Sequence, residues 1–265
     1  MLKKLLFFSL FIVIIYMWTS SCSPREPETE EDATGVISPN AEVSLQSTDT
    51  SLGSTEDAGQ SYIDSFIFLG ESTTYHLKSR GVLSGGKDTK QVWAPKRGTL
   101  MLDPSTANCR ILYPDTNEEL DIYDAMAKKK PKYLLLTFGL NGAVGNMSKG
   151  AEYFKGCYKK LISRLKEASP DTVIMLQSCF PVSKDMDTSN YSVSVDVLNS
   201  YIDRTNEWTA SLAKESGLPY LNTADALKDE DGFLKSCYDS GDGFHLNTEA
   251  YRKVLTYIRT HAYGG

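Results

Sequence analysis

The chain has few histidines, no cysteine pair spaced for metal binding and no hydrophobic run long enough to cross a bilayer. With three histidines in 265 residues and no close Cys/His spacing, we expect neither a metal site nor another cofactor. The formal net charge of −6 argues against nucleic-acid binding. A composition of 41% hydrophobic and 23% charged residues also excludes a collagen, a coiled coil and a wholly disordered chain.

The longest apolar run lies at the N-terminus and fits a secretion signal. Residues 5–18 are apolar, which is short beside the roughly 20 residues that a spanning helix needs, and they follow two lysines. Small residues ending in Cys22 come next. Segment 1–22 therefore resembles a bacterial lipoprotein signal, in which Cys22 is lipidated, although Thr19 replaces the usual aliphatic residue. The alternative is an uncleaved anchor, and both predict an extracellular, membrane-anchored protein.

Residues 23–60 differ in composition from the rest of the chain. They hold nine acidic residues against the single Arg25, with much serine and threonine and few large apolar residues. Such a segment buries too little surface to offset its ordering entropy, so we expect a disordered acidic tether. Its acidic run at residues 28–32 fits a solvated spacer better than a metal site. A folded domain of near-zero formal charge is expected at residues 61–265.

Four cysteines remain in that domain, and their state is open. In a secreted protein they allow two disulfides in three connectivities, whereas a domain of this size has core enough to keep them free and buried. They are Cys109, Cys157, Cys179 and Cys237.

Short apolar runs alternate with longer segments of helical period along the domain. The expected strands are residues 62–69, 90–94, 132–138, 171–177 and 218–221, and the expected helices are residues 151–167, 193–216 and 248–262. This alternation predicts an α/β fold, a flavodoxin-like three-layer α/β/α sandwich with a mostly parallel sheet of about five strands. Ligands of such sheets bind beyond the carboxyl ends of the strands. Residues 100–118 show little periodicity and are expected to shape the substrate site as a loop.

Two strand ends carry candidate functional residues. After the first strand, Gly70 allows a sharp turn that exposes Ser72 at the start of a helix, whose free N–H groups favour negative charge. Ser72 fits a nucleophile there, or a plain helix cap. After the third strand, the amide of Asn141 can donate two hydrogen bonds, although Asn-Gly is also a turn signal.

A third candidate group precedes the last helix. Asp242 and His245 are three residues apart, so the carboxylate can fix the imidazole tautomer and leave its other nitrogen to act as a base. Of the other histidines, His76 fits a packing or supporting role and His261 an exposed position.

Together these motifs resemble the SGNH (GDSL-like) hydrolase family over residues 61–265. The resemblance implies that Ser72 is the nucleophile, His245 the general base and Asp242 the residue that orients it. It also implies an oxyanion hole formed by the Ser72 N–H, the Asn141 amide and a glycine N–H after the second strand, for which Gly98 fits best.

The chain departs from the family pattern at two positions that are not triad members. Glu71 stands where aspartate is usual and Gly142 where a second acid is usual. We expect a serine esterase that removes O-acyl groups, acetyl first, from extracellular carbohydrate through an acyl-serine. The alternatives are a lipid esterase, an O-acyltransferase, and a non-catalytic surface module that binds a glycan or a partner. The oligomeric state stays open.

Overall fold

The computed structural model describes residues 50–103 and 109–264. The predicted signal, the lipidation site Cys22 and most of the tether lie outside these residues. The helices of the described part include none that is long and apolar enough to cross a membrane.

Five parallel strands form the central sheet, which confirms the predicted fold class. The strands are β1 (Phe66–Gly70), β2 (Val92–Trp93), β5 (Tyr133–Thr137), β6 (Val173–Gln177) and β7 (Tyr220–Leu221), in the order β2-β1-β5-β6-β7. All neighbouring pairs are parallel. Their carboxyl ends therefore meet at one edge of the sheet, where the candidate residues follow β1 and β5.

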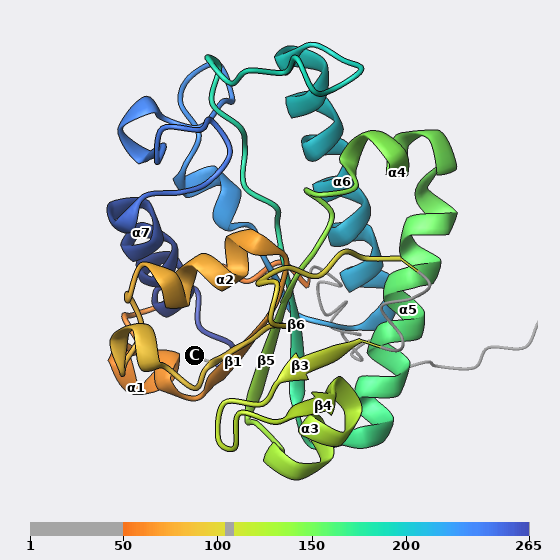
Figure 1. The fold of residues 1–265 in the computed structure, drawn as a ribbon, viewed down its shortest axis with the longest axis vertical. Helices are drawn as coiled ribbons and strands as arrows, with labels where there is room; N and C mark the ends of the chain where they lie inside the picture. Colours follow the sequence, from red (N-terminus) through yellow and green to blue (C-terminus); the bar gives the residue numbers. More distant parts are fainter. Residues whose placement is uncertain (1–49, 104–108, 265) are drawn as a thin grey trace, which may run out of the picture. The chain divides into compact units, whose positions relative to one another are not determined.

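Helices cover both faces of the sheet (Figure 1). They are α1 (Gly59–Asp64), α2 (Ser72–Ser79), α3 (Ile122–Lys129), α4 (Ala143–Lys149), α5 (Ala151–Ala168), α6 (Val195–Ser216) and α7 (Thr248–Arg259). Alternate residues of a strand point to opposite faces, so Leu134 and Leu136 pack with α3, α5 and α6, whereas Tyr133 and Leu135 pack with α1, α2 and α7. Both faces of β5 are buried, as its continuous apolar run predicts.

The described chain is already hydrogen-bonded to the sheet at Thr50, before the expected boundary at residue 61. The Thr50 carbonyl accepts from the Tyr220 N–H at 2.8 Å, and the Leu52 N–H donates to the Tyr220 carbonyl at 2.9 Å. Asp57 pairs with Arg259 at 3.0 Å. The reason is that β7 is an edge strand, whose free backbone groups accept a further chain segment. Residues 50–60 therefore belong to the domain and not to the tether.

Two further segments differ from expectation. Residues 62–64 lie in α1 instead of the first strand, which begins at Phe66. The described residues of segment 100–118 pack into the core: Leu100, Ile111 and Tyr113 are buried, and β3 (Arg110–Leu112) pairs with β4 (Glu119–Asp121). The part of this segment around β3 is therefore built into the core, whereas the Leu100 carbonyl accepts from Asn141 Nδ2 at the carboxyl edge of the sheet. That the segment shapes the substrate site stays a prediction. The structure contains no disulfide among the four cysteines of the described domain. Free thiols are found at Cys109, Cys157, Cys179 and Cys237.

Candidate active site

Ser72 stands at the sharp turn between β1 and α2. A side chain at Gly70 would collide with the Thr137 carbonyl oxygen and the Thr74 hydroxyl, so only glycine allows this turn. Ser72 is the first residue of α2 and is half-buried. The N–H groups of Thr74 and Tyr75 donate to the Glu71 carbonyl, whereas the first N–H groups of a helix have no acceptor within it. The start of α2 is thus a favourable place for negative charge beside the serine hydroxyl.

The structure brings Ser72, His245 and Asp242 together, although 173 positions separate the serine from the histidine. Ser72 Oγ lies 3.0 Å from His245 Nε2, and His245 Nδ1 lies 2.7 Å from Asp242 Oδ2. An ionised carboxylate only accepts hydrogen bonds, so Nδ1 carries the ring proton and Nε2 is free to accept the serine proton. This is the arrangement of a nucleophile, a base and an orienting group.

Asp242 holds its loop as well as the imidazole. Its Oδ1 accepts the N–H groups of Phe244 at 2.9 Å and His245 at 2.7 Å. Burial raises the pKa of this carboxyl, but the bonds from His245 and Phe244 outweigh it and leave the pKa below its ordinary value. The carboxylate therefore stays ionised at neutral pH, as its role beside the imidazole requires.

A contact between helices fixes the distance from Ser72 to His245. The Tyr251 hydroxyl on α7 donates to the Thr73 carbonyl on α2 at 2.7 Å. Because Thr73 follows Ser72 and α7 begins just after His245, this bond ties together the two elements that carry the pair. No local pattern in the sequence indicates this bond, because Tyr251 looks like one more apolar position of an amphipathic helix.

Glu71 joins the nucleophile turn to the loop after β5. Its carboxylate is 2% exposed and accepts three backbone N–H groups, from Gly139 at 2.9 Å and from Leu140 and Asn141 at 3.1 Å each. Burial raises the pKa of Glu71 to about 7 against the opposing effect of these donors. Glutamate thus makes supporting contacts in place of the usual aspartate, and its extra methylene leaves Ser72 within hydrogen-bond distance of His245.

The two expected oxyanion donors besides Ser72 are already engaged. Asn141 Nδ2 donates to Thr99 Oγ1 at 3.0 Å and to the Leu100 carbonyl at 3.3 Å, and the Gly98 N–H donates to the Pro95 carbonyl at 2.8 Å. Gly98 is therefore a turn residue here, and the expectation that its N–H faces the site is not met. Asn141 joins an oxyanion hole only if one of its two bonds opens.

The backbone conformation and the packing at position 98 explain why this residue is a glycine. Its φ of +77° is in the left-handed region, and an added Cβ would lie 3.1 Å from the Tyr75 ring. Glycine is therefore required at this position by the turn and by the ring of Tyr75, which projects from α2 and covers it. Gly142, the second departure from the family pattern, lies at the start of α4, and its carbonyl accepts the Asn146 N–H at 2.7 Å.

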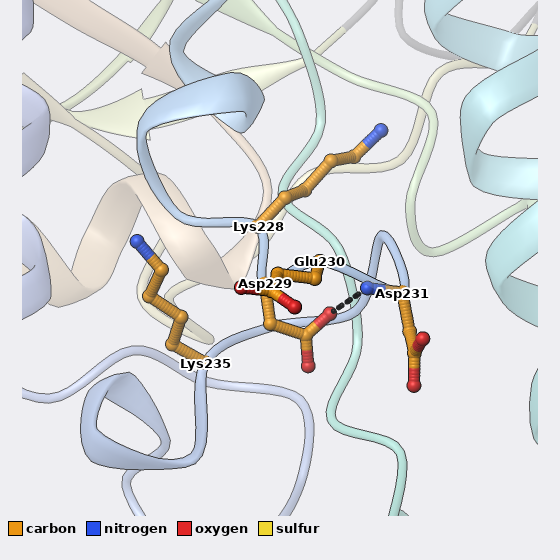
Figure 2. A pocket seen from close by; sticks show the side chains of 5 residues that line it. All are labelled: Lys228, Asp229, Glu230, Asp231 and Lys235. Atoms are coloured by element: carbon orange, nitrogen blue, oxygen red, sulfur yellow. Dashed lines mark hydrogen bonds between the residues drawn. The ribbon is translucent and has the colours of Figure 1, made fainter.

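A surface cavity of about 630 Å³ lies in a different loop, lined by Lys228, Asp229, Glu230, Asp231 and Lys235 (Figure 2). Asp229 Oδ1 accepts the N–H groups of Asp231 at 3.0 Å and Phe233 at 2.9 Å, so this acid shapes the turn. Asp231 pairs with Lys184 at 2.7 Å. Asp229 thus stabilises its own loop, Asp231 joins it to Lys184, and the cavity is not lined by the Ser72–His245 pair.

Comparison with known proteins agrees with this geometry. A family model described as GDSL-like Lipase/Acylhydrolase family matches residues 68–253. A G-D-S-L family protein from Desulfitobacterium hafniense DCB-2 is similar in structure at 15% identity, with 74% of this chain and 98% of that chain covered and a TM-score of 0.51. A protein from Streptococcus pneumonia described as a platelet activating factor gives 17% identity, coverage of 75% and 84%, and a TM-score of 0.50. At these identities the two structures show a shared fold. No match is found among curated proteins.

Proposed function

Because the chain belongs to the GDSL-like lipase/acylhydrolase family and is a carboxylic ester hydrolase, we propose that it is a serine esterase with Ser72, His245 and Asp242 as its catalytic triad. The observation that carries this proposal is the unbroken chain of two hydrogen bonds from Ser72 through His245 to Asp242. Each member is within hydrogen-bond distance of the next.

The reaction follows from this arrangement. His245 Nε2 takes the Ser72 proton as Oγ bonds to the ester carbonyl carbon, and the carbonyl electrons move onto its oxygen. This oxyanion lies against the Ser72 N–H and the start of α2. As the intermediate collapses, the ester C–O bond breaks and the alcohol leaves with the proton from His245. Water then loses a proton to His245 as its oxygen bonds to the acyl carbon. When this second intermediate collapses, the bond to Ser72 Oγ breaks, His245 returns the proton to Oγ, and the acid is released.

The surface supports a small acyl group on a large polar alcohol as the substrate. A long acyl chain needs contiguous apolar surface. Within the described residues, the exposed large hydrophobic side chains are few: Met101, Tyr191, Val197 and Tyr263. Asn141 and Asp242 at the site are exposed and polar. These features favour O-acetyl esters of extracellular carbohydrate over lipid esters.

A panel of esters tests this substrate class. We expect the full-length chain to release acetate from an acetylated polysaccharide, and to hydrolyse p-nitrophenyl acetate with a kcat/KM at least about tenfold above that for the octanoate. Faster octanoate hydrolysis would indicate a lipid esterase instead. Acetyl transfer to added oligosaccharide without release of acetate would indicate an acyltransferase. A folded chain that turns over none of the esters would be a binding module.

The same proposal places the enzyme outside the cell, anchored through a lipid on Cys22. The support is the N-terminal order of two lysines, an apolar run and small residues ending in cysteine. Cys22→Ala should move the protein from the membrane fraction to the soluble or secreted fraction of its expressing bacterium, with Cys237→Ala as the matched control. Membrane retention of Cys22→Ala would support the uncleaved anchor instead.

A further inference from the structure

A second histidine lies against the proposed catalytic base. The rings of His76 and His245 are 4.2 Å apart between centroids and inclined by 35°. His76 is four residues after Ser72 on α2, so both side chains project from one face of that helix. Along this face, His245 meets the Ser72 hydroxyl first and the His76 ring one helical turn later.

His76 offers His245 the face of its ring and not a hydrogen bond. Its Nδ1 is buried and has no hydrogen-bond partner among the residues that the structure describes. Leaving a buried polar atom unpaired is costly, and phenylalanine would fill much the same space without that cost. The contact with His245 therefore rests on the ring of His76 and not on its Nδ1, so a phenylalanine at this position should be able to make it.

The surroundings keep His76 uncharged. Burial, with smaller effects of the neighbouring His245 and Arg80, lowers its pKa to about 4, although Asp242 opposes them. His76 is thus neutral wherever His245 works as a base. A neutral aromatic face attracts a cation, whereas a charged ring at this distance would repel the imidazolium that forms when His245 takes the serine proton.

We propose that His76 is a positioning residue for the hydrolysis: its ring packs against that of His245, holds it between Ser72 and Asp242, and supports its cationic form. This inference rests on the proposed function. The Ser72 hydroxyl and the Asp242 carboxylate hold His245 at its edges, and the Phe244 ring meets it edge to face at 4.9 Å between centroids. The two hydrogen bonds alone leave the ring free to tilt about the line that joins them. Packing against one face removes that tilt.

The test compares His76→Ala with His76→Phe in the full-length chain. Because a stacked aromatic pair contributes up to about a factor of ten, His76→Ala should lower kcat on p-nitrophenyl acetate about tenfold with KM within about twofold. His76→Phe restores a flat ring and should return kcat to within about threefold of the wild type. His261→Ala is the matched control, since His261 stacks on Tyr257 at the end of α7 and should leave kcat unchanged.

Nuclear magnetic resonance of the ring protons separates positioning from general loss of structure. The chain has only three histidines, so each ring can be assigned from its variant. The His245 Nδ1 proton bonded to Asp242 should give a downfield signal that is sharp in the wild type and in His76→Phe, and broadened in His76→Ala. Full activity with a sharp signal in His76→Ala would overturn the proposal, and so would a His76→Phe variant as slow as His76→Ala.

The two levels of inference fail in different ways. If the wild type hydrolyses no ester, the proposed function fails, but the His245 signal in the alanine and phenylalanine variants still reports whether His76 holds the ring. If the wild type is active and the signal does not depend on residue 76, the esterase stands and the role of His76 is wrong.

Discussion

Ser72→Ala should abolish covalent labelling by a fluorophosphonate probe and lower ester hydrolysis by about 10⁴-fold or more. The reason is that Ser72 Oγ is the atom 3.0 Å from His245 Nε2, and alanine removes the nucleophile while leaving the base and its partner in place. Since the members of a triad act as a unit, His245 alone should not rescue the rate. Intact mass measurement after labelling gives one adduct on the wild type and none on the variant.

Ser79→Ala is the matched control for this experiment. Ser79 ends the same helix, and its hydroxyl donates to the His76 carbonyl at 3.4 Å, so the loss of this hydroxyl should leave labelling unchanged. An adduct that persists on Ser72→Ala would assign the nucleophile to another residue. A folded wild type that forms no adduct would contradict the esterase and favour the binding module.

The fold could be predicted because its strands carry their own signal. β5 and β6 lie buried on both faces and are therefore continuous apolar runs, and α5 shows an apolar stripe of helical period. Short elements gave no such signal. The helix α1 has six residues with Ile63 as its buried member, so residues 62–64 read equally well as the start of a strand. The attachment of Thr50 to β7 is a tertiary contact and leaves no local pattern.

In the candidate site, too, some residues could be predicted from the sequence and others could not. Ser72, Asp242 and His245 follow from motif and spacing, because each is placed by a turn next to a strand or helix whose position was predictable. The oxyanion donors did not follow, since the partner of an N–H or amide depends on neighbouring chain segments. The Pro95 carbonyl accepts the hydrogen bond of the Gly98 N–H, and the Leu100 carbonyl accepts one from the Asn141 side-chain amide.

Glu71 should make the stability of the protein fall as the pH rises from about 4.5 to about 7. Burial raises the pKa of this carboxyl in the folded chain to about 7 from 4.5. Between these values the folded state binds the proton and the unfolded state does not, so the free energy of unfolding decreases with rising pH. The difference of about 2.5 pKa units corresponds to about 3 kcal/mol over the whole window, with no further change above it.

Urea unfolding of the wild type and of Glu71→Gln at a series of pH values measures this effect. All other groups titrate alike in the two proteins, so the wild-type free energy of unfolding minus that of Glu71→Gln reports on Glu71 alone. This difference should fall by about 3 kcal/mol as the pH rises from about 4.5 to about 7. Glu215→Gln is the control, because Lys155 and Lys159 lower the pKa of Glu215 to about 2 and its difference should be flat above pH 5. A flat difference for Glu71→Gln would mean that the three backbone donors from the loop after β5 balance the effect of burial. A difference that moves in favour of the wild type would mean that they outweigh it, and that Glu71 holds the nucleophile turn as a carboxylate at every pH where the enzyme works.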